Sequence, residues 1–259
     1  MEPKRPAGDS KNLKQNVSRI FLLSILGGPG VPAPAPGASF CCDWADSLLK
    51  YLILQGFRMR SAVFLDRDGT VCEEMGYINH IDRLRLYPWS VAAIARLNRA
   101  AVAVVVVTNQ GGAAMGYFPE ILIQQVHDRL RLELAQGGAK LDAIYYCPHH
   151  PHAVHPEYRA PCDCRKPAPG MLRRAERELS LDLKSSYIVG DRYRDLETGF
   201  AVEARGVMVL SGYGKGEYLY DRGKWPRMPD HIADDLTNAV DWILEDMASR
   251  EMQPLEKAL

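Results

Sequence analysis

Apolar positions along this chain alternate between short continuous runs and helical spacings, starting at Ser61. The run at 101–107 is apolar and rich in valine, which is typical of a parallel strand buried on both faces. Residues 90–99 instead repeat apolar side chains at the spacing of one helix face. Strands that alternate with helices predict an α/β fold around a central parallel sheet. The expected strands are 62–65, 101–107, 143–147, 187–189 and 206–210, and the expected helices are 90–99, 119–135, 169–179, 194–204 and 239–247.

The two ends of the chain lack this pattern. We expect residues 1–58 to form an N-terminal extension, with a Pro/Gly-rich segment at 29–37 and one helix at 43–55. Met59 is a candidate translation start, because the regular pattern begins just after it. The domain proper is expected to span 59–247, with 211–230 as a surface loop and 248–259 as a frayed tail.

The bulk composition bounds the class of protein. Lys plus Arg and Asp plus Glu are both 32, so the formal net charge is zero, which gives no reason to expect nucleic acid or an anionic membrane as partner. The apolar stretch at 20–26 weakly imitates a signal peptide but is far shorter than the roughly 20 residues of a membrane span. We therefore expect a monomeric cytoplasmic protein.

Polar side chains stand at the ends of successive expected strands. Asp66 and Asp68 follow the first strand and precede a glycine, and Asp191 follows the fourth. Carboxylates gathered at one sheet edge repel one another unless a cation is present, and oxygen ligands suit Mg²⁺. Thr108 and Lys166 add donors for an anion, so the set is typical of phosphoryl transfer. Each motif alone could be a turn, a calcium loop or a helix cap, and only their ordered occurrence favours catalysis.

A second cluster combines cysteine and histidine. Cys147 and His149 form a C-x-H pair, Cys162 and Cys164 form a C-x-C pair, and twelve residues separate the pairs. Three thiolates and one imidazole suit structural Zn²⁺, and four protein ligands leave no open position for water. The loop at 147–164 has no helix or strand pattern, so a metal would supply its missing core. The alternatives are free thiols or a disulfide.

Four segments carry a family resemblance. Residues 64–70 (FLDRDGT), 105–110 (VVVTNQ), 164–167 (CRKP) and 189–192 (VGDR) resemble the four motifs of the haloacid-dehalogenase (HAD) superfamily. More narrowly, the chain is similar to the D-glycero-D-manno-heptose-1,7-bisphosphate 7-phosphatase and histidinol-phosphatase subfamily. The similarity runs from about 62 to about 210 in unbroken order, and it implies a Rossmann-like HAD fold with a minimal cap and a zinc-binding loop.

The resemblance implies a role for each motif residue. Asp66 would be the nucleophile and Asp68 the general acid and base. Mg²⁺ would be held by Asp66, the backbone carbonyl of Asp68 and Asp191, with Asp195 in support. Thr108 and Lys166 would hold the transferring phosphoryl group. The residues expected to line the substrate site are Glu74, Gly76, Tyr77, Asn109, Arg165 and Arg192.

Two departures from the subfamily pattern leave the sugar open. Cys72 stands where the subfamily usually has Asn, and Met115 stands where it usually has Arg. The expected substrate is a sugar bisphosphate, D-glycero-D-manno-heptose 1,7-bisphosphate. The expected reaction is Mg²⁺-dependent hydrolysis of its 7-phosphate through an aspartyl-phosphate intermediate. The alternatives are a phosphatase for histidinol phosphate or another small phosphate ester, a DNA 3′-end phosphatase, and a non-catalytic zinc-stabilised interaction domain. Zero net charge argues against the DNA 3′-end phosphatase. The presence of all the candidate catalytic residues argues against the non-catalytic interaction domain.

Overall fold

The computed structural model describes residues 59–256, with side chains as far as Arg250. The expected extension at 1–58, including its helix at 43–55, lies outside the described residues, as do residues 257–259.

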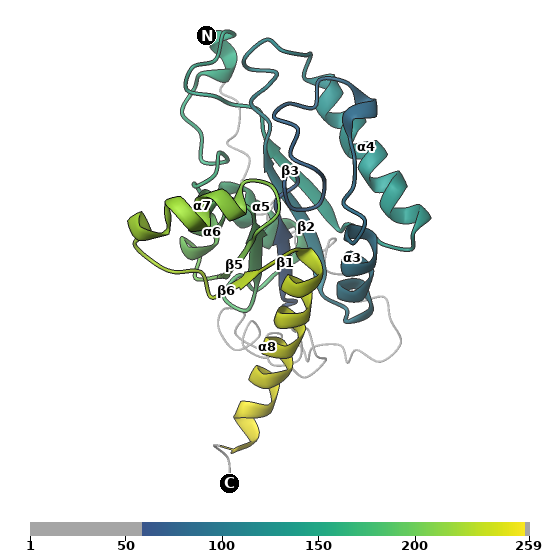
Figure 1. Cartoon of the computed structure of the whole chain (residues 1–259), viewed down its shortest axis with the longest axis vertical. Helices are drawn as coiled ribbons and strands as arrows, with labels where there is room; N and C mark the ends of the chain where they lie inside the picture. The colour runs from purple at the N-terminus through teal and green to yellow at the C-terminus, as the bar shows by residue number, and fades with distance from the viewer. Residues whose placement is uncertain (1–58, 257–259) are drawn as a thin grey trace, which may run out of the picture. The chain divides into compact units, whose positions relative to one another are not determined.

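Among the described residues, six parallel strands form one sheet in the order β3-β2-β1-β4-β5-β6 (Figure 1). The chain builds outward from β1 through β2 and β3, and then continues on the other side of β1 with β4. Leu65 at the end of β1 pairs with Val106 on one side and with Val189 on the other. Residues just beyond these positions therefore meet at the point where the strand order reverses, which is where open α/β sheets bind ligands. The strands are β1 (Ala62–Leu65), β2 (Ala103–Asn109), β3 (Ala143–Cys147), β4 (Tyr187–Gly190), β5 (Arg205–Val209) and β6 (His231–Ala233).

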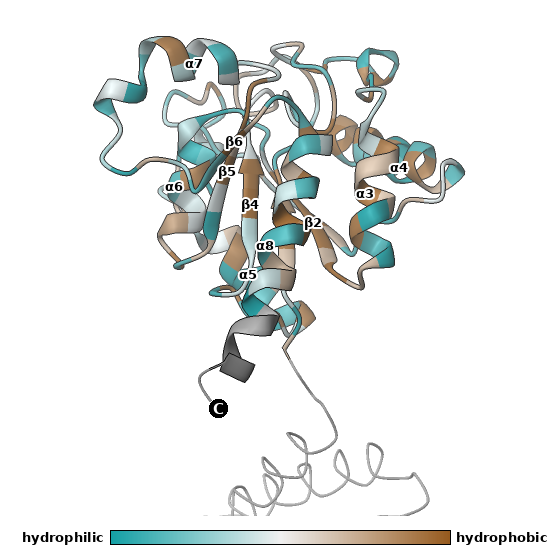
Figure 2. Cartoon of the chain, turned by 60° about the horizontal axis from the view of Figure 1, so that its bottom comes forward, coloured by the Kyte–Doolittle hydropathy of each residue, from teal (hydrophilic) through white to brown (hydrophobic). Residues whose placement is uncertain are grey.

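Helices cover both faces of this sheet. Val63 and Leu65 point to one face and pack with α3 (Ser90–Arg99), α4 (Ile121–Gln136) and α8 (Leu236–Glu256). Phe64 points to the other face, against α5 (Gly170–Leu179), and α6 (Tyr193–Phe200) packs beside it on β5. Figure 2 shows largely hydrophobic strands between helices in which hydrophilic and hydrophobic residues alternate. Both faces are buried, which explains the continuous apolar runs of the strands.

The expected α/β class with a central parallel sheet is confirmed. The helix expected at 90–99 is α3, with Ile94 and Leu97 fully buried. Between β1 and α3 the chain forms one short 3-10 helix, η1 (Ile81–Arg83), so this connection carries no cap domain. Two more 3-10 turns, η2 (Pro156–Tyr158) and η3 (Arg222–Lys224), complete the elements together with α7 (Gly214–Tyr220).

The second strand is shifted from its expected place. It begins at Ala103 rather than at 101, because Ala101 has a φ of 58° and belongs to the turn after α3. It ends later, at Asn109, because Asn109 pairs with Cys147 of β3. Thr108 and Asn109 are therefore the last residues of a strand, which fixes the direction of both side chains.

The C-terminal part differs most from expectation. The segment 211–230 contains α7 and η3 rather than only a loop, and the three-residue strand β6 was not expected. Helix α8 begins at Leu236, where the Asp235 carboxylate accepts hydrogen bonds from Thr237 N at 2.6 Å and Asn238 N at 3.3 Å. It continues to Glu256, through most of the expected tail. None of the helices described is long and apolar enough to cross a membrane.

Candidate active site

Three buried carboxylates and one lysine meet where the strand order reverses. Asp66 follows β1, Asp191 follows β4, and Asp195 lies in the first turn of α6. Their oxygen atoms all lie within 4.8 Å of one another. Lys166 Nζ lies 2.6 Å from Asp66 Oδ1 and 2.8 Å from Asp195 Oδ1, and it donates to the carbonyl of Val107 at 2.9 Å. Residues a hundred positions apart in the chain thus form one compact charged cluster.

The cluster is short of positive charge. Burial raises the pKa of Asp66 to about 7, although Lys166 acts in the opposite direction. Burial also raises the pKa of Asp191 to about 9, and the neighbouring Asp66 and Asp195 add to the shift. Burial alone would lower the pKa of Lys166, but the two carboxylates beside it more than offset this and leave it raised. Carboxylates in this situation ionise when a divalent cation joins them.

The residues present fit a magnesium ion. The donors are oxygen atoms, which Mg²⁺ prefers. Asp191 is 1% exposed, and its Oδ2 accepts a hydrogen bond from Tyr213 N at 2.8 Å. Its Oδ1 is buried and has no hydrogen-bond partner among the residues that the structure describes. A buried carboxylate oxygen without a donor is costly unless it faces a cation, so the chemistry of this cluster favours a metal.

Backbone packs tightly around Asp191. Gly69 has a φ of +88°, and a Cβ atom placed on it would lie 2.1 Å from Asp191 Oδ2. A Cβ atom on Gly212 would lie 2.2 Å from the same oxygen. The Ser211 hydroxyl donates to the carbonyl of Gly69 at 2.6 Å, which ties the loop after β5 to the loop after β1. Glycine is therefore required at 69 both by conformation and by space.

The second motif aspartate, Asp68, lies apart from this carboxylate cluster. Its carboxylate pairs with Arg67, whose Nη2 lies 2.8 Å from Oδ2. Gln110 Nε2 donates to Asp68 Oδ2 at 2.8 Å and to Thr108 Oγ1 at 2.9 Å. Gln110 thus links the candidate acid/base to the candidate phosphate-binding hydroxyl. Cys72 Sγ lies 3.5 Å from Asp68 Oδ1, so the residue that departs from the subfamily pattern touches the same carboxylate.

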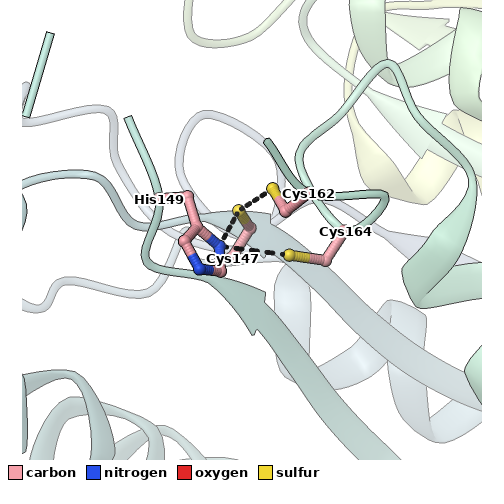
Figure 3. A group of neighbouring side chains, drawn as sticks. All are labelled: Cys147, His149, Cys162 and Cys164. Atoms are coloured by element: carbon pink, nitrogen blue, oxygen red, sulfur yellow. Dashed lines mark hydrogen bonds between the residues drawn. The ribbon is translucent and has the colours of Figure 1, made fainter. Parts of the chain in front are cut away.

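Lys166 lies just after the loop at 147–164, called the cysteine–histidine loop below. The four candidate metal ligands of this loop converge (Figure 3). Cys147 ends β3, and the other three ligands come from the loop after it. The ligand atoms lie within 4.8 Å of one another. The structure therefore brings together the predicted set of Cys147, His149, Cys162 and Cys164.

The spacing of these ligands fits a tetrahedral ion. Thiolates about 2.3 Å from a tetrahedral zinc lie about 3.8 Å apart. Cys147 Sγ and Cys162 Sγ are separated by 3.7 Å, and His149 Nδ1 lies 3.5 Å from Cys147 Sγ and 3.4 Å from Cys164 Sγ. Within the described residues these thiols form no disulfide, and a sulfur separation of 3.7 Å is far longer than the roughly 2.05 Å of a disulfide. The sequence left free thiols or a disulfide open as alternatives to zinc, and the structure does not show the disulfide.

The residues expected to line the substrate site fall into two groups. Glu74, Gly76 and Tyr77 lie on the loop between β1 and α3, where Glu74 Oε1 accepts a hydrogen bond from Gly76 N at 2.6 Å. Tyr77 is 42% exposed, and its ring lies 4.8 Å from that of Tyr117, centroid to centroid. Both tyrosines border a surface hollow of about 420 Å³ that also reaches Arg83.

The remaining three make contacts within the protein. Arg165 Nη1 donates to the carbonyl of His149 at 2.7 Å, so it is tied to the cysteine–histidine loop. The Arg192 guanidinium stacks over the Tyr213 ring at 3.6 Å. Asn109 makes two hydrogen bonds to the backbone of Lys166. Each of these three residues thus contacts a protein group, and Asn109 uses both ends of its amide on the backbone of Lys166.

Comparison with known proteins places this arrangement in a family. A HAD-hydrolase-like family model matches residues 163–239. The D-glycero-beta-D-manno-heptose-1,7-bisphosphate 7-phosphatase of Photorhabdus laumondii is 44% identical over 154 residues, which are 60% of this chain and 81% of the relative. The enzyme of the same name from Escherichia coli K12 is 38% identical over 187 residues, which are 72% of this chain and 90% of the relative.

This chain belongs to that family of HAD-type phosphatases. As a member, it is a phosphoric monoester hydrolase. Among solved structures, the D,D-heptose 1,7-bisphosphate phosphatase from B. bronchiseptica, complexed with magnesium and phosphate, is 32% identical with a TM-score of 0.63. The match covers 72% of this chain and 99% of that one. The resemblance inferred from the four motifs is therefore confirmed.

Several residues of this HAD-type site were not singled out from the sequence. Gln110 bridges Thr108 and Asp68, and its only signal was its place directly after the second motif. Tyr213 donates its backbone N–H to Asp191, but it follows the fifth strand in a segment expected to be a surface loop. The buried contact of Arg67 with His127 had no sequence signal, since a lone histidine on a helix face is ordinary.

Proposed function

We propose that the protein removes the 7-phosphate of D-glycero-D-manno-heptose 1,7-bisphosphate through an aspartyl-phosphate intermediate, with Mg²⁺ as cofactor. The observation that carries this proposal is the buried cluster in which Lys166 Nζ lies 2.6 Å from Asp66 Oδ1, beside Asp191. The family relatives named for that substrate support the choice of sugar.

In the first half of the reaction, an Asp66 carboxylate oxygen attacks phosphorus in line with the departing sugar oxygen. The P–O bond to the sugar breaks as the Asp66–phosphorus bond forms. Lys166 and Thr108 donate hydrogen bonds to the phosphoryl oxygens, on which charge is spread in the transition state. Asp68, in its acid form, gives a proton to the leaving alkoxide. Lys166 and Thr108 are almost fully buried, at 3% and 1% exposure, so water screens their interaction with the phosphoryl group little.

In the second half, Asp68 takes a proton from a water molecule that attacks the phosphorus of the aspartyl-phosphate. Inorganic phosphate leaves and Asp66 regains its carboxylate. Gln110, which already holds one Asp68 oxygen and the Thr108 hydroxyl, keeps the base and the phosphate-binding hydroxyl in a fixed relation. The same carboxyl group therefore serves as acid and then as base.

The magnesium ion would be held by Asp66, Asp191 and the backbone carbonyl of Asp68. When bound, it neutralises phosphate charge and the mutual repulsion of the carboxylates. Oδ1 of Asp191, for which residues 59–256 offer no hydrogen-bond partner, supports this assignment. Asp195 supports the site differently, because its Oδ1 forms an ion pair with Lys166 Nζ at 2.8 Å and its Oδ2 accepts from Arg192 N at 3.1 Å.

The cysteine–histidine loop would hold a structural zinc ion through Cys147, His149, Cys162 and Cys164. Its role in function is to order the segment that carries Arg165 and Lys166. Because Arg165 bonds the carbonyl of His149, its guanidinium is fixed by the same loop. Free thiols in such a site also support the expected cytoplasmic location, where the compartment is reducing.

For the substrate, Arg165 is the residue best suited to a second anionic group, and Glu74, Gly76 and Tyr77 would border the sugar. The hollow of about 420 Å³ beside Tyr77 and Tyr117 offers room next to that loop. Asn109 and Arg192 would shape the site chiefly through the protein groups they contact, Lys166 and Tyr213.

The test is phosphate release with and without Mg²⁺ from heptose 1,7-bisphosphate, histidinol phosphate and several hexose phosphates. We expect the heptose bisphosphate to have the highest kcat/KM by at least about tenfold. Mg²⁺-dependent turnover with a clear preference for another ester would keep the mechanism and reject the substrate. Absence of turnover on every ester would reject both.

A further inference from the structure

Arg67 connects the candidate acid/base to helix α4 through a buried contact. The Arg67 guanidinium is 1% exposed. Its Nε and Nη2 donate to both carboxylate oxygens of Asp68 at distances from 2.8 to 3.2 Å. Its remaining nitrogen, Nη1, lies 3.1 Å from Nε2 of His127, whose side chain is also buried. Every nitrogen of the guanidinium is therefore fixed by either Asp68 or His127.

The chemistry of this contact fixes the state of His127. A guanidinium offers only donors, so the facing Nε2 must accept and cannot carry a proton. The imidazole is then neutral with its proton on Nδ1. Burial lowers the pKa of His127 to about 3, and the positive charge of Arg67 acts in the same direction. Both the contact and this lowered pKa favour a neutral His127 that accepts from Arg67 near pH 7.

The imidazole is itself held in place from a second element. Its ring packs edge-on against Tyr146 of β3, with 5.6 Å between centroids. The Tyr146 hydroxyl donates to Glu120 Oε1 at 3.0 Å, which anchors that ring next to the start of α4. The position of His127 Nε2 is therefore set by helix α4 on one side and by strand β3 on the other.

We propose that His127 is a positioning residue for the phosphatase reaction, fixing the plane of the Arg67 guanidinium and through it the orientation of the Asp68 carboxyl group. The inference rests on the proposed function, in which Asp68 transfers protons. Gln110 Nε2 holds only Oδ2 of Asp68, so the Arg67–Asp68 pair can still pivot about that oxygen, and proton transfer depends steeply on the geometry of the acid. The acceptor on α4 removes that freedom.

A misplaced acid matters most for a leaving group that needs a proton. An alkoxide leaves poorly without protonation, whereas 4-nitrophenolate leaves readily as an anion. The ratio of kcat on the sugar phosphate to kcat on 4-nitrophenyl phosphate therefore reports the placement of Asp68. A general loss of folded or metal-loaded enzyme lowers both values together and leaves the ratio unchanged.

The experiment compares the full-length parent with three variants on both substrates. His127→Phe keeps a ring against Tyr146 but removes the acceptor, and His127→Gln restores an acceptor. Asp128→Asn is the matched control, because Asp128 is exposed on the same helix. We expect His127→Phe to lower the ratio about tenfold or more with KM little changed, His127→Gln to recover most of it, and Asp128→Asn to match the parent. A parent-like ratio in His127→Phe would overturn the proposal.

A second measurement needs no variant. Nitrogen NMR of the parent imidazoles reports which ring nitrogen of His127 is protonated, with His127→Gln used to assign the signal. We expect an unprotonated Nε2 and a protonated Nδ1, and a protonated Nε2 would overturn the contact with Arg67. The NMR result does not depend on catalytic turnover. A parent that hydrolyses no ester would reject the proposed function alone, whereas a fully active His127→Phe would reject only the positioning role.

Discussion

Asn109 holds the backbone of Lys166 through both ends of its side-chain amide. Its Nδ2 donates to the carbonyl of Lys166 at 3.1 Å, and its Oδ1 accepts from the N–H of Lys166 at 3.0 Å. The two residues are 57 positions apart in the chain. Because Asn109 is the last residue of β2, this pair attaches the lysine of the cysteine–histidine loop to the rigid sheet.

Asn109→Ala should therefore damage the placement of Lys166 more than the binding of substrate. We expect kcat to fall roughly 10- to 100-fold while KM stays within about threefold. Asn98→Ala is a matched control, since Asn98 holds the backbone of Lys140 with the same pair of hydrogen bonds, on the surface. Steady-state kinetics of both variants make the comparison. A raised KM with unchanged kcat would instead favour the direct substrate contact that the sequence suggested for Asn109.

Asp66→Asn should abolish turnover and leave the fold intact. The amide matches the carboxylate in shape, but it is not a nucleophile at phosphorus, so we expect kcat to fall by more than about 10³-fold. Acid quenching during turnover of a ³²P-labelled substrate should trap labelled protein with the parent only. Circular dichroism should show the same unfolding temperature within a few degrees. Labelled Asp66→Asn protein would show that the nucleophile lies elsewhere.

The candidate site could be predicted from the sequence largely because apolar runs end abruptly in polar residues. Asp66 and Asp191 each follow a fully buried strand, and a parallel sheet brings such strand ends to one edge. The meeting of Cys147, His149, Cys162 and Cys164 could be predicted for a different reason, since two close pairs of sulfur and nitrogen donors have few other uses. Neither inference needed knowledge of side-chain packing.

What the sequence could not show depends on contacts between distant elements. His127 occupies an ordinary buried position of an amphipathic helix, and only the folded chain places it on Arg67. Strand β6 has three residues, too few for a period-two pattern to stand out. The dual contact of Asn109 likewise required the loop after Cys164 to return to the end of β2.

Cys162→Ser and Cys164→Ser should each lower zinc content, stability and activity together. Loss of one thiolate leaves three ligands, and the loop that carries Lys166 loses its central support. We expect less than about half the parent zinc per chain, and an unfolding free energy lower by at least about 2 kcal/mol. Metal analysis and denaturant unfolding measure these two quantities. His152→Ala is the control from the same loop, because His152 is exposed and stands outside the ligand cluster. Equal zinc in Cys162→Ser and parent would contradict the proposed site.

Gly69→Ala should disable the magnesium site by steric means. The added Cβ would lie 2.1 Å from Asp191 Oδ2 and 2.5 Å from its Cγ, so the carboxylate must move away from the position next to Asp66. We expect activity at saturating substrate to fall more than about 100-fold, and the Mg²⁺ concentration for half-maximal activity to rise.

Gly138→Ala separates this clash from backbone strain. Gly138 has a φ of +77°, close to the +88° of Gly69, but a Cβ atom there would meet no atom of the described part of the chain within 4 Å. Alanine at 138 should cost about 1 kcal/mol of stability through its left-handed conformation and leave kcat and the Mg²⁺ dependence at parent values. Titration of activity with Mg²⁺, alongside thermal unfolding of both variants, makes the comparison. If Gly69→Ala resembled Gly138→Ala in activity, Asp191 could not be a ligand held in the position that this structure gives it.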